Sequence, residues 1–514
     1  MIPQLPYKDI LSSAGIFLAL AIVFGLIYSQ SVLFTSNQNQ YFLHGLATAK
    51  FGFLEHDWLA NTLDPTPVFS FLVNWTYRIF NSGIPFYVYY VLLLAAYLYA
   101  LIGISRSLFD FRDRYKTLIY LVMLLTIHSA ALRVTLASLM GDEWTYLLEG
   151  GLAGQRILGE VFQPSSFGIF LIISIYLFLM NYRMMAVIAL ALAAIMHPTY
   201  LLSAGSLVLS FMVLVYQEEK SVKKALQIGI FAFILILPIL IYVATSFRSS
   251  GPDLASQAQR ILVRFRIPHH AQVSDWWNVT AFIQIMIMLI GIWIVRHSRL
   301  FTILVIPFAL GAVLTIIQII TKIDAIALLF PWRISSILVP LSTSIILAYC
   351  VSNIPGKNQT TWEKYHLPII ALSSVVCIFL MVIGTVRFEL EQRTAVFAKE
   401  HDLFKYLEKS KTSGDIYLVP TKMQEFRLAT GAPIFVDFKS IPYQNKEVLE
   451  WYRRMQRTIR FYNEERAACG LLADFHRDEG ITHVVIETGG KEIDCIFLKE
   501  RYSDEHYQVF EFTN

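Results

Sequence analysis

The stretch FLEHDWLANTLDPTPVF, residues 53–69, decides how this chain is understood. It lies after a first hydrophobic segment at residues 12–30, where a tight hairpin into a second apolar segment would be the ordinary continuation. The chain instead has a long polar connection in which Glu55, His56 and Asp57 stand side by side. Carboxylates at the mouth of a helix bundle suit proton abstraction or metal binding beside a substrate held in lipid. The stretch therefore favours chemistry at a membrane over a simple channel.

The composition of the chain sets its broad class. Its 514 residues are 56% hydrophobic, 14% aromatic and only 16% charged, with a mean hydropathy of +0.54. Soluble domains are about 25% charged, so the composition indicates an integral membrane protein. Because no basic run is interleaved with aromatic residues, nucleic acid is excluded as a partner.

The hydrophobic segments predict a polytopic helical protein. A helix needs about 20 apolar residues to cross the hydrocarbon of a bilayer. The segment at 67–80 is too short and carries Arg78, so we expect it to lie as a helix at the membrane interface. We predict about eleven spans, at residues 12–30, 84–104, 117–136, 166–181, 184–197, 199–216, 225–245, 277–295, 300–320, 330–352 and 366–386.

Alternate short loops are rich in lysine and arginine, and this bias sets the orientation. With the N-terminus in the cytoplasm, the basic loops are cytoplasmic and the acidic loops are outer. Since the number of spans is odd, the C-terminal segment lies outside. We therefore predict a multi-pass protein of the plasma (inner) membrane. The inner residues are Arg106, Arg112, Arg114, Lys116, Arg183, Lys220, Lys223, Lys224, Arg296, Arg299, Lys357 and Lys364.

One outer loop, residues 246–276, opposes this bias because it contains several arginines, Arg264 and Arg266 among them. One interpretation is an interfacial helix whose arginines contact lipid headgroups. The other is a clamp for a phosphate, since the planar guanidinium fits phosphate oxygens and its charge does not titrate away.

The sequence predicts two domains. Residues 1–387 form a transmembrane domain whose first outer loop spans 31–83, and residues 388–514, richer in charge, form a small extracytoplasmic α/β domain. In an oxidising compartment Cys469 and Cys495 pair, although buried free thiols fit the sequence equally well. Strands are predicted at 415–420, 433–438, 482–487, 495–500 and 507–512.

Polar residues far apart in sequence are predicted to meet on the outer face. Convergence of carboxylates, histidines and an arginine on one face is the expected outline of an active site. Each residue also has a simpler explanation, as a solvated loop charge, a charge that stabilises a helix N-terminus, a helix-end cap or a snorkelling arginine. The residues are Glu55, His56, Asp57, Asp142, Glu143, His197, Trp332 and Arg333.

Over residues 37–104 the chain resembles the C-type membrane glycosyltransferases (GT-C), in particular the protein-mannosyltransferase-like branch. The likeness lies in NQNQYFLHGLATAKFGFLEHDW followed by DPTPVFSFLVNWTYRIF, in which Gly52, Asp57 and the Asp64–Pro67 segment match the pattern. The chain departs from it where Asn37, Gln38 and Asn39 replace an acidic pair.

The resemblance implies inverting transfer of a sugar from a polyprenyl-phosphate carrier at the outer face. Asp57 would accept the proton of the acceptor hydroxyl, and Asp142 or Glu143 would orient the acceptor or a divalent metal. Arg333, with Arg264 or Arg266, would neutralise the leaving phosphate. Glu55, His56, His197 and Trp332 would complete the substrate site. A non-catalytic lipid-glycan binding or assembly protein of the same fold, favoured by the lost acidic pair, and a secondary transporter are the alternatives.

Overall fold

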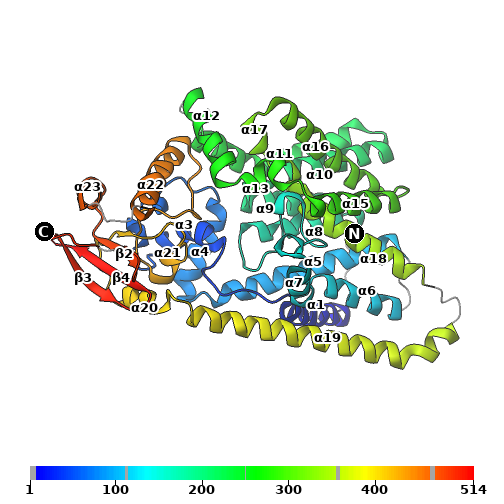
Figure 1. Cartoon of the computed structure of the whole chain (residues 1–514). Coiled ribbons are helices and arrows are strands. Elements are labelled where there is room, and N and C mark those ends of the chain that lie inside the picture. Colours follow the sequence, from blue (N-terminus) through cyan, green and yellow to red (C-terminus); the bar gives the residue numbers. More distant parts are fainter. Residues whose placement is uncertain are drawn as a thin grey trace. The chain divides into compact units, whose positions relative to one another are not determined.

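The computed structural model describes residues 7–109, 114–248, 251–354, 359–463, 469–491 and 493–513 (Figure 1). The chain divides into two compact units, which we call the helical unit and the mixed unit. The helical unit comprises Met1–Gln30, Phe86–Leu240 and Ile267–Glu389. The mixed unit comprises Ser31–Pro85, Ile241–Arg266 and Leu390–Asn514.

Apolar helices dominate the chain, which confirms the predicted class of a polytopic α-helical membrane protein. Six of the described helices are long and apolar enough to cross a membrane. They lie at Ile84–Leu108 (α5), Pro198–Glu219 (η6 and α10), Val222–Ser246 (α11), Arg299–Thr321 (α16), Asp324–Ser352 (α17, η8 and α18) and Leu367–Val396 (within α19, Gln359–Val396).

The remaining predicted spans coincide with a bent pair and with shorter apolar helices. Arg114–Ile127 (α6) and Ala130–Met140 (α7) are together long and apolar enough to cross a membrane, and the chain bends by 50° between them. At the bend, Ser129 caps α7 by accepting a hydrogen bond from Leu132 N at 3.1 Å. The shorter apolar helices are Ala14–Tyr28 (within α1, Tyr7–Tyr28), Pro164–Leu179 (η5 and α8), Arg183–Met196 (α9) and Val279–Ile294 (α15).

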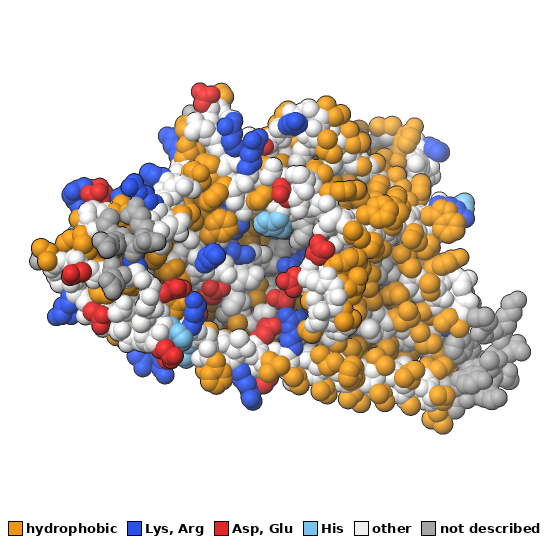
Figure 2. Space-filling view, in the orientation of Figure 1, with side chains coloured by type: hydrophobic (Ala, Val, Ile, Leu, Met, Phe, Trp, Pro, Cys, Tyr) orange, Lys and Arg blue, Asp and Glu red, His pale blue; other side chains and the backbone are white. Residues whose placement is uncertain are grey.

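The surfaces of these helices suit a lipid environment. In the most apolar stretches of α11 and α19, only 17% of the residues are buried within the protein. Figure 2 shows mostly hydrophobic side chains over α15 and α19. Exposed apolar area of this extent is unusual in soluble proteins and marks a membrane-contacting surface. The protein is therefore a multi-pass membrane protein.

The mixed unit combines short helices with a small sheet. Its early helices are α2 (Gln38–Tyr41), α3 (Leu43–Thr48), η1 (Leu54–His56), η2 (Leu59–Asn61) and α4 (Pro67–Phe80), followed by α12 (Pro252–Ile261) and η7 (Leu262–Arg266). Its C-terminal helices are α20 (His401–Ser410), α21 (Phe426–Thr430), α22 (Asn445–Asn463) and α23 (Cys469–Glu479). Helix α4 occupies the segment expected to lie at the interface and exposes Phe71, Trp75 and Ile79 along one side.

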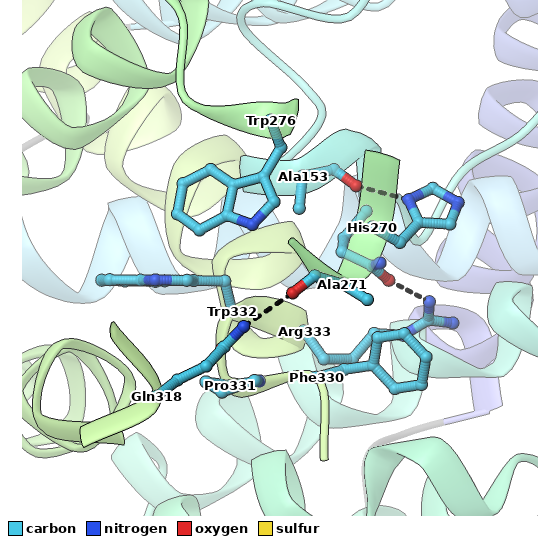
Figure 3. A pocket seen from close by; sticks show the side chains of 10 residues that line it. Ala153, His270, Ala271, Trp276, Gln318, Phe330, Pro331, Trp332 and Arg333 are labelled. Atoms are coloured by element: carbon cyan, nitrogen blue, oxygen red, sulfur yellow. Dashed lines mark hydrogen bonds between the residues drawn. The ribbon is translucent and has the colours of Figure 1, made fainter. Parts of the chain in front are cut away.

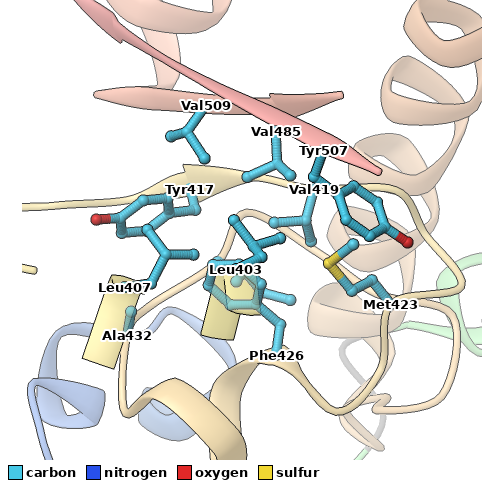
Figure 4. Close-up of a cluster of buried hydrophobic side chains, with 11 residues drawn as sticks. Leu403, Leu407, Tyr417, Val419, Met423, Phe426, Ala432, Val485, Tyr507 and Val509 are labelled. Atoms are coloured by element: carbon cyan, nitrogen blue, oxygen red, sulfur yellow. The ribbon is translucent and has the colours of Figure 1, made fainter. Parts of the chain in front are cut away.

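The mixed unit contains a four-stranded sheet formed by the C-terminal segment. Its order is β1 (Tyr417–Leu418), β2 (His483–Glu487), β4 (Tyr507–Phe512) and β3 (Leu498–Ser503), with β1 parallel to β2 and the other pairs antiparallel. One face packs on α20 and α21 through an apolar cluster (Figure 4). The cluster comprises Leu403, Leu407, Tyr417, Val419, Met423, Phe426, Ala432, Ile434, Val485, Tyr507 and Val509.

Two expectations for the C-terminal segment are settled by the structure. The strand predicted at 433–438 is wrong, because this buried segment forms only an isolated bridge from Ile434 to Tyr417. Cys469 and Cys495 form a disulfide, with their Cα atoms 5.7 Å apart.

Candidate anion-binding site

A glycine-rich loop of the helical unit forms one side of the site. Residues 150–156 read GGLAGQR. Gly151 passes so close to the start of α18 that an added Cβ would lie 2.4 Å from the Ser336 nitrogen, so only glycine fits there. Leu152 N donates to Ser335 Oγ at 2.8 Å, which fixes the loop on α18. Ala153 has a positive φ of 56°, a strained conformation of the kind that collects at functional sites.

The imidazole of His270 faces this loop from α13 (Pro268–Ala271). Its Nδ1 lies 2.5 Å from the carbonyl oxygen of Ala153 (Figure 3). Since a carbonyl only accepts, Nδ1 carries the proton. Burial, followed by the charges of His269, Arg333 and Arg156, lowers the pKa of His270 to about 3. The ring is therefore neutral near pH 7, and its Nε2 is a hydrogen-bond acceptor.

Arg333 reaches the same loop from η8 (Pro331–Ile334). Its NH1 donates a hydrogen bond to Gln155 Oε1 (Figure 3). Its guanidinium lies over the ring of Tyr200, 4.8 Å from the centroid. Its Nε is buried and finds no hydrogen-bond partner among the described residues. The indole nitrogen of the neighbouring Trp332 is likewise buried without a hydrogen-bond partner among the described residues. Buried polar groups are nearly always bonded in folded proteins, so these donors indicate a place for a ligand or water.

The ion pairs of the helical unit single out two arginines. Arg156 stacks on Tyr146, 3.8 Å from the ring centroid, and like Arg333 it is half-buried. Neither has a carboxylate partner in the part of the chain that the structure describes. The other buried or half-buried arginines of this unit are all paired, as Arg133–Glu149, Arg183–Glu219, Arg299–Glu218 and Arg387–Glu160. Two arginines without an ion-pair partner, at residues 156 and 333, mark this region as a candidate site for an anion.

The space between these groups is small. A cavity of about 10 Å³ has room for about one water molecule. A phosphate is larger, so it would contact the edge of the cavity or require the Gln155 and Arg333 side chains to move apart. The described lining, which contains no carboxylate, consists of Ala153, Gln155, His270, Ala271, Trp276, Gln318, Phe330, Pro331, Trp332 and Arg333.

Three of the residues expected from the sequence meet in this part of the helical unit. Trp332 and Arg333 line the cavity. His197 lies buried between α9 and η6 (Pro198–Tyr200), and the ring of Tyr200 lies against the guanidinium of Arg333. The structure thus places these three residues near one another, and their role in a substrate site stays a prediction.

Asp142 and Glu143 lie apart from the cavity lining. They begin the short helix η3 (Asp142–Trp144), and both are exposed. Glu143 accepts a hydrogen bond from Asn278 Nδ2 at 3.0 Å. Exposed carboxylates are available to an incoming acceptor or metal ion, so their catalytic assignment stays a prediction.

Asp57 lies in the mixed unit, in a fully buried position. Its carboxylate accepts hydrogen bonds from Leu59 N at 2.9 Å, Ile434 N at 3.0 Å and Arg427 Nε at 2.7 Å. A base must reach the proton that it removes. The burial and these hydrogen bonds therefore favour a structural role for Asp57 over that of a base.

The remaining predicted residues also belong to the mixed unit. Glu55 is half-buried and His56 is exposed, both on η1. Arg266 donates from NH2 to Lys439 O at 2.6 Å and lies over the ring of Phe438, so its guanidinium is engaged within the unit. Arg264, on the same turn, is exposed. Among the described residues, no group of three or more His, Cys, Asp or Glu side chains is placed to hold a metal ion.

Sequence reasoning missed Gln155, Arg156 and His270. A signal for the first two was present, because GGLAG is a glycine run directly before them in an outer loop. Glycine runs mark places where the backbone approaches another group closely. His270 lies in the arginine-rich loop 246–276, and its partner Ala153 is distant in sequence.

A family model described as a domain of unknown function (DUF6798) matches residues 398–458. No curated protein matches the chain. Among solved structures, the chain is similar to ArnT from Cupriavidus metallidurans bound to undecaprenyl phosphate, with 11% identity, a TM-score of 0.49 and coverage of 97% of this chain and 98% of that chain. At this identity and TM-score, the match assigns neither a family nor an activity.

Proposed function

We propose that this membrane protein is a glycosyltransferase that takes a sugar from a lipid-linked phosphate donor. One observation carries the proposal: Arg156 and Arg333 are the half-buried arginines of the helical unit without a carboxylate partner among the described residues. Half-buried arginines without an ion-pair partner, in a membrane protein, suit the phosphate of a polyprenyl carrier. The sequence resemblance over residues 37–104 supports the same donor class.

The chemistry assigns each group a task. The bond between the sugar anomeric carbon and the phosphate oxygen breaks, and the acceptor oxygen forms a bond to the same carbon. Arg156 and Arg333 stabilise the negative charge that develops on the leaving phosphate. The acceptor hydroxyl gives its proton to a carboxylate, for which Asp142 and Glu143 are the candidates. The neutral His270, through Nε2, accepts a hydrogen bond from a sugar hydroxyl.

The outer membrane face is the proposed location of this reaction. The lysine and arginine bias of the short loops supports this orientation. The Cys469–Cys495 disulfide supports it independently, since disulfides persist in oxidising compartments outside the cytoplasm.

A second candidate is a protein that binds a lipid-linked glycan without transferring it. Two observations favour it: the described cavity lining contains no carboxylate, and Asp57 is locked in an ion pair. The replacement of the acidic pair by Asn37, Gln38 and Asn39 points the same way.

Binding of polyprenyl phosphate to the purified protein in nanodiscs tests the proposed donor. Arg156→Ala and Arg333→Ala should each weaken binding about tenfold or more, because a charge-assisted contact is lost. Arg296→Ala is a matched control, since Arg296 also stacks on an aromatic ring, that of Trp293, but is exposed. Equal affinity for polyprenyl phosphate and the uncharged polyprenol, or for wild type and both variants, would overturn the phosphate assignment.

Transfer itself distinguishes the two candidates. The assay measures release of polyprenyl phosphate from a panel of polyprenyl-phosphate sugars, with membrane extract as the source of acceptor. The rate of release should fall roughly 100-fold in Asp142→Asn or in Glu143→Gln, whichever carboxylate is the base. Donor binding without release by the wild-type protein would support the non-catalytic candidate.

A further inference from the structure

The core-facing side of the sheet in the mixed unit changes from apolar to polar residues along its strands. Val485 on β2 pairs with Val509 on β4, and both belong to the apolar cluster. Two residues further along the same strands, His483 pairs with Glu511. Because paired residues alternate between the faces of a sheet, His483 and Glu511 lie on the same face as the two valines. A half-buried polar row thus follows directly after the apolar core.

The row continues across the sheet and leads to a cavity. Tyr417 on β1 is in register with His483, and the two rings stack with centroids 4.6 Å apart. Figure 4 shows the hydroxyl of Tyr417 pointing away from the cluster that holds its ring. This hydroxyl donates to Asp415 Oδ2 at 3.2 Å. Beside these residues is a cavity of about 280 Å³, close to the lower limit of roughly 300 Å³ for small-molecule sites.

A bulge in β3 supplies the remaining charge of the cavity. The register between β3 and β4 shifts between Glu500 and Tyr502, which leaves Arg501 without a paired residue. Arg501 forms an ion pair with Glu511 and lines the cavity. Bulges of this kind re-aim a side chain and are frequent beside binding sites.

The lining combines flat rings with hydrogen-bonding groups and a net negative charge. Tyr406 from α20 joins Tyr417 and His483 as aromatic walls. Burial lowers the pKa of His483, so its ring is neutral near pH 7. The two negative charges of Asp415 and Glu511 then outnumber the single positive charge of Arg501. Such a lining disfavours anions, offers acceptors to hydroxyl or ammonium groups, and gives an apolar ring face a surface on which to lie.

We propose that this cavity binds one sugar ring that is uncharged or carries an amine. It lies within the mixed unit, and the inference does not depend on the transferase proposal. Glu511 and Asp415 accept hydrogen bonds from the sugar hydroxyls, while Tyr406 contacts the apolar face of the ring. The cavity of about 280 Å³ has room for one monosaccharide unit, free or at the end of a glycan.

Titration of the full-length protein in nanodiscs, free of sugar-based detergent, tests this site. The probes are methyl β-glucoside, glucosamine and glucuronate, with binding followed by saturation-transfer NMR and calorimetry. The first two should bind, and glucuronate should bind at least tenfold more weakly. Failure of both to bind, or tighter binding of glucuronate, would overturn the proposal.

Variants confirm where the sugar binds. Glu511→Gln should weaken glucoside binding about tenfold, the scale of a lost hydrogen bond to a charged group. Tyr406→Leu should weaken it severalfold, because the aromatic surface under the sugar ring is lost. Glu500→Gln is the matched control, since Glu500 is an exposed carboxylate of β3 that is not part of the lining. Thermal unfolding identifies a variant that fails to fold. Unchanged sugar affinity in both folded cavity variants would contradict the site, whereas polyprenyl phosphate binding at Arg333 should be the same in all of them.

Discussion

Arg427 Nε donates to Asp57 Oδ2 at 2.7 Å, joining two residues that are 370 positions apart in the sequence. Both side chains are almost fully buried, at 2% and 0% exposure. Arg427 also pairs with Asp437, which is equally buried. The first loop of the mixed unit is therefore fastened to the C-terminal segment by a buried charge cluster rather than by apolar contact alone.

Asp57→Asn should destabilise the mixed unit. The change leaves Arg427 with one carboxylate and places an amide near the Ile434 nitrogen, which itself needs an acceptor. Breaking a buried ion pair costs about 3 kcal/mol. We expect a clear fall in the thermal unfolding midpoint. Asp478→Asn, at an exposed ion pair of the same unit, should change it little. A variant that keeps its unfolding temperature but loses transfer would restore Asp57 as a catalytic candidate.

The sequence predicted the helical part of the fold well. Long apolar segments are readable because every backbone group in a membrane must be satisfied within its own helix. The same local signal located α4 at 67–80. The segment 433–438 was wrongly assigned to a strand because PIFVDF has β-forming residues, whereas its Ile434 nitrogen bonds to the distant Asp57 side chain. Local propensity carries no information on such a long-range partner.

The site was predictable only in part, for a related reason. His197, Trp332 and Arg333 could be expected together because they lie at helix ends on the same predicted face. Arg156 could be recognised only by exclusion, once the other arginines had partners. The role expected for Asp57 depended on its place in a motif, and its burial became visible only with Arg427 in position.

Arg333→Lys should weaken binding of polyprenyl phosphate although the charge is kept. Lysine lacks the planar fork that bonds Gln155 while lying on Tyr200. We expect a loss smaller than that of Arg333→Ala, measured by titration at low and high salt. Arg296→Lys provides the control. If Arg333→Lys binds like the wild type, the site recognises charge alone and the planar fork of Arg333 plays no part in binding.

The predicted orientation can be tested by cysteine labelling. In a background with Cys350→Ser and Cys377→Ser, the native disulfide is retained and the free thiols are removed. Val222→Cys should react with an impermeant maleimide only from the cytoplasmic side, and Asn445→Cys only from the outside. Labelling of both positions from one side would contradict the eleven-span topology and the outer placement of the reaction.

Acidification should destabilise the protein partly through His270. The ordinary histidine pKa is about 6.5, and in the folded protein that of His270 is lowered to about 3. Between these values the unfolded chain binds a proton that the folded chain does not, so stability present above pH 6.5 is lost as the pH falls. The slope is on the order of 1 kcal/mol per pH unit. His270→Gln keeps a donor for Ala153 but does not titrate, so its unfolding midpoint should fall less steeply between pH 7 and pH 4.

His297→Gln, at an exposed histidine, should follow the wild type. Parallel curves for wild type and His270→Gln would mean that His270 is protonated in the folded protein, and the neutral acceptor assigned to it would be wrong.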